Sequence, residues 1–223
     1  REKELHIHGP KGIKEVINIQ LKHSKSYVKY KIIFHELNST ESELIFEDEK
    51  VKVYTIPLNH RVYTNGFLFK EKEKSRKINI SAVKKFKEID VCDYNNLKAG
   101  KDFKLDSGDV IKNSELTYNP EKPLSYAYCS DTSYKPTIIE MIEGADLLYH
   151  ESTFLTDKED LASKTGHSTA KQAATIAKKA NVKKLVLGHY SSRYKDISLF
   201  KKEAQEVFKN VSLAETGRVY FSK

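Results

Sequence analysis

The amino-acid sequence predicts a layered α/β (α+β) fold, because strand and helix signals alternate in its second half. From Leu124 onward, short apolar segments typical of strands alternate with segments whose apolar residues recur at helical spacing. This is the pattern of a sheet covered by helices. The chain has 223 residues, which is enough to bury one large core. Because no internal repeat or low-complexity linker interrupts it, we expect residues 1–223 to form one domain without an internal boundary.

The first part of the chain contains strand and helix signals in close succession. A Gly-Pro-Lys-Gly turn at 9–12 separates a short apolar segment from apolar residues at positions 13, 16, 17 and 21, which predicts a strand, a loop and a helix. Farther along, apolar and polar residues alternate, which predicts half-buried antiparallel strands. The expected elements are a strand over 5–8, a helix over 13–21, and strands over 27–37, 49–58 and 66–69.

The second half alternates more regularly. The expected strands cover 125–129, 146–150, 184–188 and 218–221, and the expected helices cover 136–143, 169–180 and 199–208. Ser168 or Thr169 is expected to cap the 169–180 helix, because a hydroxyl at this position accepts a hydrogen bond from a free backbone N–H of the first turn.

A basic segment lies between the two halves. Residues 70–87 contain eight Lys or Arg side chains, and the apolar anchors among them are Ile78, Ile80, Val83 and Phe86. Because these few apolar residues can bury only a small area, we expect a protruding, mobile basic arm inserted at about 70–95. An ordinary solvated helix face is the alternative explanation of these charges.

Composition restricts the compartment and the partners. The chain has 39 Lys+Arg against 31 Asp+Glu, a formal net charge of +8, which favours partners that carry phosphate. Two cysteines, Cys92 and Cys129, cannot form a disulfide framework and fit no zinc spacing, so any zinc would need His and Asp ligands. No apolar run reaches the roughly 20 residues of a membrane helix, and the N-terminus lacks the core of a signal peptide. We therefore expect a soluble, cytoplasmic protein.

Five polar clusters lie just past predicted strands, where a layered fold gathers its functional loops. A single His in such a place is most often structural, so no cluster is diagnostic alone. Together they offer imidazole and carboxylate at several strand ends, which are ligands that zinc accepts, and a carboxylate can bridge two metal ions. The clusters are Asn59-His60, Ser130–Thr132, His150–Thr153, Gly166–Thr169 and Gly188–Tyr194.

Six ordered sequence blocks, spread over nearly the whole chain, resemble the short form of ribonuclease Z. This family comprises the tRNA 3′-processing endonucleases of the metallo-β-lactamase superfamily. The blocks are Leu5–Gly12, Ile56–His60 with Gly66-Phe67, Tyr128–Thr132, His150–Phe154, Gly166–Ala170 and His189–Tyr194. The resemblance implies a partial αββα metallo-β-lactamase fold and a cytoplasmic homodimer.

The same resemblance implies a site with two zinc ions. His60, Asp131 and His189 match the family's metal ligands, with Asp131 as the bridge. Glu151 and His167 match its Glu/His pair, which orients and supplies the proton for the leaving oxygen. Two metal ions about 3.5–4 Å apart activate water and relieve charge on both the attacking and the leaving oxygen of a phosphodiester.

The substrate implied by the resemblance is precursor tRNA, cut to leave a 3′-hydroxyl. Arg193 matches a family residue near the scissile phosphate, and Lys84 and Lys85 belong to the basic arm with which family members grip tRNA.

Two features depart from the family pattern. The H-x-H-x-D-H loop that provides the remaining metal ligands does not occur, and His6-Ile7-His8 does not replace it, because Pro10 and Lys11 stand where Asp and His should follow. The chain also begins without Met and enters a strand at once, so we expect part of the fold to precede it and this chain alone to bind zinc weakly. At the arm tip, Ile89–Tyr94 stands where a Gly-Pro-rich motif is expected.

Three other interpretations stay open. The protein could be a hydrolase of the same superfamily that acts on a small phosphodiester or sulfate ester, although such an enzyme gains nothing from a basic arm. It could be a non-catalytic RNA-binding fragment, because the main metal-binding loop is absent. Glu151 could simply cap the turn that follows it.

Overall fold

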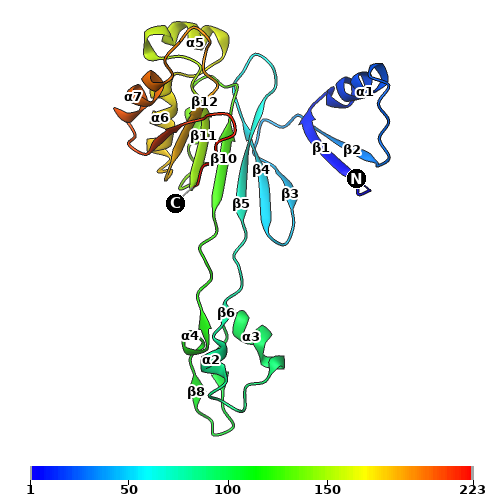
Figure 1. Ribbon diagram of the computed structural model, residues 1–223, viewed down its shortest axis with the longest axis vertical. Helices are drawn as coiled ribbons and strands as arrows, with labels where there is room; N and C mark the ends of the chain where they lie inside the picture. Colours follow the sequence, from blue (N-terminus) through cyan, green and yellow to red (C-terminus); the bar gives the residue numbers. More distant parts are fainter. Residues whose placement is uncertain (1, 222–223) are drawn as a thin grey trace. The chain divides into compact units, whose positions relative to one another are not determined.

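The computed structural model of the chain describes residues 2–221 (Figure 1). Two compact units are distinguished, one formed by residues up to Lys70 together with those from Leu124 onward, and the other by Glu71–Pro123. The inserted segment that we expected at about 70–95 therefore extends to Pro123, because downstream residues complete its core.

The larger unit is built on a mixed sheet that, in the described part of the chain, has seven strands in the order β13-β12-β11-β10-β5-β4-β3. Strands β10 to β13 run parallel, β5 pairs antiparallel with β10, and β3 pairs antiparallel with β4. The strands are β3 (Leu44–Glu47), β4 (Val51–Pro57), β5 (Asn65–Glu71), β10 (Ser125–Cys129), β11 (Leu147–Glu151), β12 (Leu185–Gly188) and β13 (Val211–Leu213).

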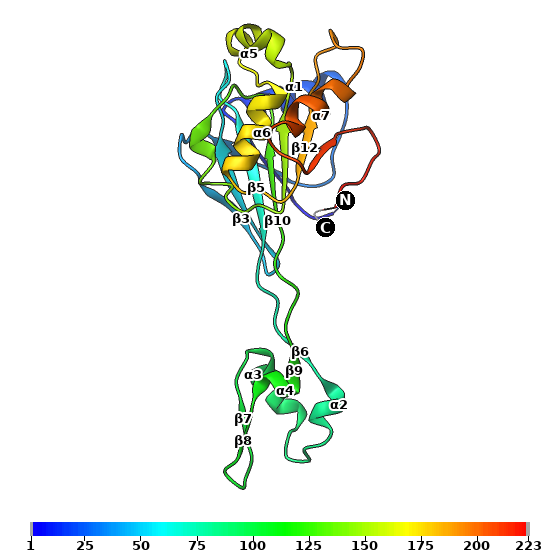
Figure 2. The same cartoon turned by 90° about the vertical axis from the view of Figure 1, so that its left-hand side faces the viewer.

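Two helices lie on one face of this sheet, α6 (Ala170–Lys179) and α7 (Ser198–Gln205) (Figures 1 and 2). Helix α6 contacts β11 and β12, and α7 contacts α6 and β13. The inner side of α6 is made of fully buried small residues, Ala170, Ala173, Ala174 and Ala177, which let the helix lie close to the sheet. Thr169 begins this helix with a capping box, as expected, by accepting a hydrogen bond from the Gln172 N–H.

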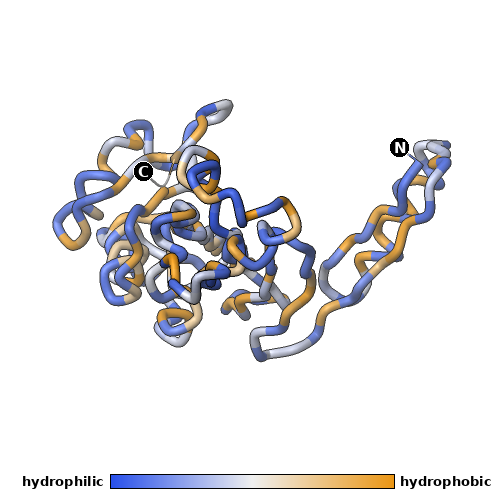
Figure 3. The backbone as a smooth tube through the Cα atoms, turned by 90° about the horizontal axis from the view of Figure 1, so that it is seen from below, coloured by the Kyte–Doolittle hydropathy of each residue, from blue (hydrophilic) through white to orange (hydrophobic). Residues whose placement is uncertain are grey.

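Shorter helical turns complete the larger unit. They are the 3₁₀ turns η2 (Pro136–Ile138) and η3 (Thr156–Lys158) and the helix α5 (Glu159–Thr165). The N-terminal residues form a βαβ motif of β1 (Leu5–Pro10), α1 (Ile13–His23) and β2 (Ile32–Leu37), whose strands are parallel. No helix in the described residues is long and apolar enough to cross a membrane. Figure 3 shows that hydrophobic stretches along the backbone are short and interrupted by hydrophilic residues.

The smaller unit has a hydrophobic core of its own. Val83, Ile89, Leu97, Ile111 and Leu116 are buried together, and three of these five lie beyond residue 95. The expectation of an arm with too few apolar anchors to bury area was wrong for this reason. Its elements are β6 (Lys77–Ile78), α2 (Ile80–Val83), η1 (Val91–Asp93), α3 (Tyr94–Lys98), β7 (Phe103–Lys104), β8 (Val110–Ile111), α4 (Asn113–Leu116) and β9 (Thr117–Tyr118).

Several expected elements differ in detail. The helix expected over 136–143 is only the short turn η2, with Pro136 at its start. The 27–37 segment is a strand only from Ile32, and it pairs parallel with β1 because α1 connects the two. Residues 218–221 are not a strand; instead the Tyr220 hydroxyl donates to Leu213 O at 2.5 Å, and β13 provides the last strand of the sheet.

A buried carboxylate aligns the three strands that lead to the polar clusters. Asp146, which is 3% exposed, accepts hydrogen bonds from Ser125 N (2.7 Å) and Ser125 Oγ (3.0 Å) at the start of β10 and from Lys183 Nζ before β12. Burial alone would raise the pKa of Asp146, but the hydrogen bonds from Lys183 and Ser125 outweigh it and hold the pKa below its usual value.

We predict that Asp146→Asn lowers the free energy of unfolding at pH 7 by about 1–3 kcal/mol, because it weakens charge-assisted hydrogen bonds. A depressed folded-state pKa gives stability that is fully present above the unfolded pKa of about 3.9 and is lost as the pH falls through the folded value. Urea unfolding at several pH values should therefore show the two proteins converging below pH 4. The exposed Glu140→Gln serves as the matched control, and an equal effect of both changes would contradict the role of Asp146.

Candidate metal centre

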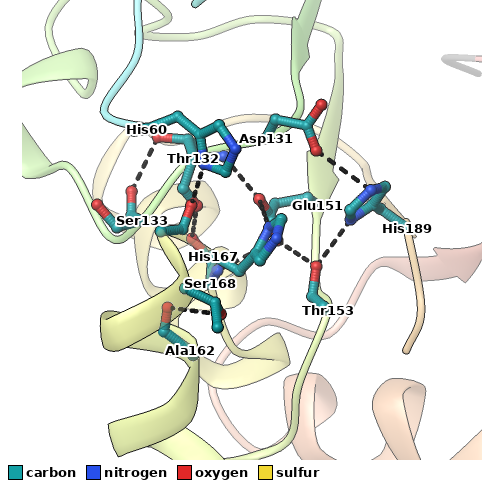
Figure 4. Close-up of polar contacts among 12 residues, drawn as sticks. His60, Asp131, Thr132, Ser133, Glu151, Thr153, Ala162, His167, Ser168 and His189 are labelled. Carbon is teal, nitrogen blue, oxygen red and sulfur yellow. Dashed lines mark hydrogen bonds and ion pairs between the residues drawn. The ribbon is translucent and has the colours of Figure 1, made fainter. Parts of the chain in front are cut away.

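Three parallel strands end at the same edge of the sheet and bring their polar residues together there. The register places Cys129 opposite His150 and Glu151 opposite Gly188, so the residues that follow β10, β11 and β12 are neighbours. Asp131, Glu151, His167 and His189 each offer a potential ligand atom, and these four atoms lie within 4.8 Å of one another. Figure 4 shows these four side chains close together.

The backbone turns sharply at two members of the cluster. Asp131 and His189 both have left-handed conformations, with φ of 57° and 59°. Asp and His are among the non-glycine residues that tolerate this region best, although it still costs free energy. These turns lie directly after β10 and β12, and Asp131 Oδ1 lies 3.1 Å from His189 Nε2.

Glu151 is the buried centre of the hydrogen-bond network. Its Oε1 accepts hydrogen bonds from Thr132 N–H (2.6 Å) and His167 Nδ1–H (2.9 Å). Its Oε2 accepts from the Thr153 hydroxyl (2.5 Å) and Ser168 N–H (3.1 Å). A carboxylate has about four lone-pair sites, and all four are used. Glu151 therefore has no free lone pair for a metal, and its interactions exceed those of a residue that caps one turn.

The Thr153 hydroxyl connects this carboxylate to His189. A hydroxyl has a single hydrogen, and Thr153 donates it to Glu151, so its contact of 2.8 Å with His189 Nδ1 must be a hydrogen bond donated by the imidazole. The hydrogen of neutral His189 is then on Nδ1, and Nε2 carries the lone pair. A fixed Nδ1–H partner of this kind is typical of metal-binding histidines.

His60 is held in the same way from another direction. Its Nδ1–H donates to Gly166 O at 2.9 Å, which leaves Nε2 with the lone pair. Gly166 has φ of 75°, and a Cβ atom at this position would lie 2.7 Å from His60 Nδ1, so only glycine allows this approach. The His60 ring lies beside the His167 ring, with centroids 5.2 Å apart, and His167 lies equally close to His189.

The donor set fits a divalent metal ion. With its hydrogen on Nδ1, neutral His189 directs its Nε2 lone pair to Asp131 Oδ1 across 3.1 Å. A metal ion bound by both atoms, or a second proton on the ring, makes this contact favourable. Two ligands of a tetrahedral zinc ion, at about 2.0–2.1 Å each, would be about 3.3 Å apart. His150, directly before Glu151, takes no part: burial lowers its pKa, and its Nδ1–H donates to Glu151 O at 2.8 Å.

Comparison with known proteins agrees with this geometry. A family model described as "Beta-lactamase superfamily domain" matches residues 119–190. The curated ribonuclease Z of Bacteroides fragilis strain YCH46 is 44% identical over 215 residues, which cover 96% of this chain and 70% of the relative. The chain belongs to the ribonuclease Z family. The ribonuclease Z of Porphyromonas gingivalis strain W83 is 43% identical over 92% of this chain and 67% of its own length.

Solved structures extend the comparison to the fold. Human tRNase Z, short form, matches with a TM-score of 0.58 and 24% identity, covering 94% of this chain and 64% of the human chain. The metallo-β-lactamase fold protein YhfI of Bacillus subtilis matches with a TM-score of 0.59 and 19% identity over 97% of this chain and 65% of its own. The expected metallo-β-lactamase fold is thereby confirmed, and the chain spans about two thirds of the length of these ribonuclease Z and fold relatives.

The remaining site residues expected from the ribonuclease Z resemblance lie outside the cluster. Arg193 is exposed on the loop after His189, where Ser191 N–H donates to Thr153 O and Tyr194 Oη accepts from Leu155 N–H. Lys84 and Lys85 are exposed at the end of α2 in the smaller unit. The ligand set His60, Asp131 and His189 stays a prediction, because the structure groups Asp131 and His189 directly and places His60 next to His167.

Sequence reasoning gave no role to Thr153, Thr132 or Gly166. All three stand inside the sequence blocks that resemble ribonuclease Z, but the roles of Thr153 and Gly166 depend on contacts with residues 36 and 106 positions away. The neighbouring Ser168 has two such contacts, since its N–H donates to Glu151 and its hydroxyl donates to Thr132 O at 2.7 Å.

We predict that Thr153→Val lowers the zinc affinity of the folded chain by about 10–100-fold, because it removes the group that orients His189. Valine is nearly the same size, so the fold should be retained, which circular dichroism can check. Competition for zinc with a chromogenic chelator measures the ratio of the zinc affinities of the unchanged chain and the variant. Thr156→Val, at an exposed threonine outside the network, is the control; an unchanged affinity in Thr153→Val would contradict the role of the hydroxyl.

Proposed function

We propose that the protein carrying this chain is a metal-dependent endoribonuclease that removes the 3′ trailer from precursor tRNA and leaves a 3′-hydroxyl. The observation that carries the proposal is the Glu151 carboxylate, which orients His167 directly and His189 through Thr153 beside Asp131. Relatives named ribonuclease Z at more than 40% identity support the same activity. From the family resemblance we further propose zinc as the metal, a cytoplasmic location and a homodimer.

The proposed metal ligands are His60, Asp131 and His189, all with unoccupied lone pairs. When bound, the metal would supply hydroxide near neutral pH and neutralise charge on the reacting phosphate. Asp131 and His189 are both partly exposed, with side-chain exposures of 49% and 42%, so a phosphodiester can reach them. Arg193, on the loop after His189, is proposed to bind a phosphate of the substrate.

His167 is proposed to provide the proton for the leaving group. As the bond between phosphorus and the 3′ oxygen breaks, that oxygen must gain a proton, and a positioned imidazole can donate it. Nδ1 of His167 is occupied by Glu151, so Nε2 is the atom that can face the substrate. Glu151 is a positioning residue in this scheme, because its four lone pairs are directed to protein groups.

The distribution of charge in the smaller unit supports RNA as the substrate. Residues 71–87 have seven Lys or Arg and two Glu, whereas residues 88–123 have five Lys and eight Asp or Glu. The expected tip, Ile89–Tyr94, contains Asp90 and Asp93, which form a capping box around η1. Phosphate contacts are therefore proposed for the α2 region with Lys84 and Lys85, rather than for this tip.

We predict that Asp131→Ala in the protein carrying this chain abolishes both metal binding and cleavage of precursor tRNA. His167→Ala should keep the metal content and slow cleavage by about 10²–10⁴-fold, the usual contribution of general acid catalysis. Metal analysis and single-turnover cleavage measure the two effects separately. Loss of metal from His167→Ala would show that His167 is a ligand, and cleavage of small phosphodiesters without any cleavage of precursor tRNA would replace the substrate proposed here.

A second prediction tests the smaller unit. Reversal of charge in Lys84→Glu/Lys85→Glu should weaken binding of precursor tRNA and reduce the slope of log affinity against log salt by about one for each lost phosphate contact. The control is Lys98→Glu/Lys104→Glu, which makes the same change of charge at exposed positions of the same unit. Equal losses in both variants would show a general effect of charge and contradict a specific α2 contact.

A further inference from the structure

A cleft lies beside the candidate metal centre on the side of His60 and His167. Its volume is about 620 Å³, and its lining, which includes His60 and His167, contains two cations, Arg61 and Lys164, and no carboxylate. Neither Arg61 nor Lys164 forms an ion pair or side-chain hydrogen bond with another described residue, so both charges are available to a ligand.

Local structure brings the two cations to this cleft from different elements. Arg61 directly follows His60, whose ring is tied to Gly166 O, and Lys164 lies in the last turn of α5, two residues before Gly166. The interaction that positions His60 therefore also joins the loop of Arg61 to the helix of Lys164.

Two neighbouring clefts that both contain His167 are lined by side chains of opposite charge. A neighbouring cleft of about 490 Å³ shares Asn59, Ser133, Ser163 and His167 with the first, but its remaining lining residues include Glu159 and Asp160. A polyanion that reaches His167 is attracted to the side of Arg61 and Lys164 and repelled from the side of the two carboxylates.

We infer that the cleft of Arg61 and Lys164 binds backbone phosphates of the RNA segment on the 5′ side of the cut, which becomes the 3′ end of the mature product. The inference rests on the proposed function and specifies which side of the cut RNA lies in this cleft. His167 protonates the 3′ oxygen that leaves, so the nucleotide carrying this oxygen lies next to His167. The phosphates that precede it along the strand then lie over the cleft that His167 lines, where two unpaired cations can bind them.

The test uses the complete 223-residue chain and two RNA probes. One is an acceptor-stem minihelix that ends in the 3′-hydroxyl of the product, and the other is a short single-stranded RNA with a 5′-phosphate, which represents the released trailer. Binding is measured at several salt concentrations for the unchanged chain, for Arg61→Gln/Lys164→Gln, and for Lys178→Gln/Lys179→Gln, which removes two exposed cations from the end of α6.

We expect Arg61→Gln/Lys164→Gln to bind the minihelix about tenfold or more weakly, with a salt slope smaller by about two, one for each lost phosphate contact. The trailer probe should lose no more affinity than it does with the control variant. Weaker binding of the trailer instead would place the opposite side of the RNA in the cleft and overturn the inference. Unchanged minihelix binding, a loss equal to that of the control, or no minihelix binding by the unchanged chain would overturn it as well.

A cleavage assay distinguishes the failure of this inference from the failure of the proposed function. If the protein carrying this chain cuts precursor tRNA but minihelix binding does not depend on Arg61 and Lys164, the function stands and the inference fails. If binding depends on both cations but no precursor tRNA is cut, the cleft binds RNA and the proposed reaction is wrong.

Discussion

The buried carboxylate of Glu151 is the constraint on which the candidate site depends. A buried charge must be fully hydrogen-bonded, since an unpaired one costs several kcal/mol. Glu151 meets this requirement with donors that follow β10 and β11 and precede α6. His167, one of these donors, is the proposed proton donor, and the others lie next to or bind residues of the site: Thr132 follows Asp131, Ser168 follows His167, and Thr153 orients His189. Satisfying one carboxylate therefore positions the whole cluster.

The rest of the larger unit keeps these segments in register. Asp146 joins the starts of β10 and β11 to Lys183 before β12, so the ends of the three strands arrive at the same level. The alanine face of α6 packs closely against β11 and β12, and the N-terminus of that helix presents Ser168 N–H to Glu151. Strands β10, β11 and β12 and helix α6 thus determine both the core packing and the geometry of the site. A change in strand register would separate Asp131 from His189.

The sequence could predict those parts of the structure that depend on local patterns. Parallel strands of alternating βα type place Asp131, Glu151 and His189 at one sheet edge, and the Thr169 cap follows from its position before an Ala-rich helix. The tautomer of His189 could not be predicted, because it depends on a hydroxyl 36 residues away. The core of the smaller unit was missed because Leu97, Ile111 and Leu116 lie beyond the basic segment that drew attention to it. Apolar and polar residues alternate over 218–221 as in a strand. In the structure this segment forms no strand, and the Tyr220 hydroxyl donates a hydrogen bond to Leu213 O of β13.

The most direct measurement of the central claim is a long-range ¹H–¹⁵N spectrum of the imidazole side chains, recorded with and without zinc. If Glu151 orients both rings, His167 and His189 carry a hydrogen on Nδ1 in each condition, and in Glu151→Gln the Nδ1–H of His189 is no longer fixed. A His189 ring with its hydrogen only on Nε2 in the unchanged chain, or identical spectra for Glu151→Gln, would contradict the account.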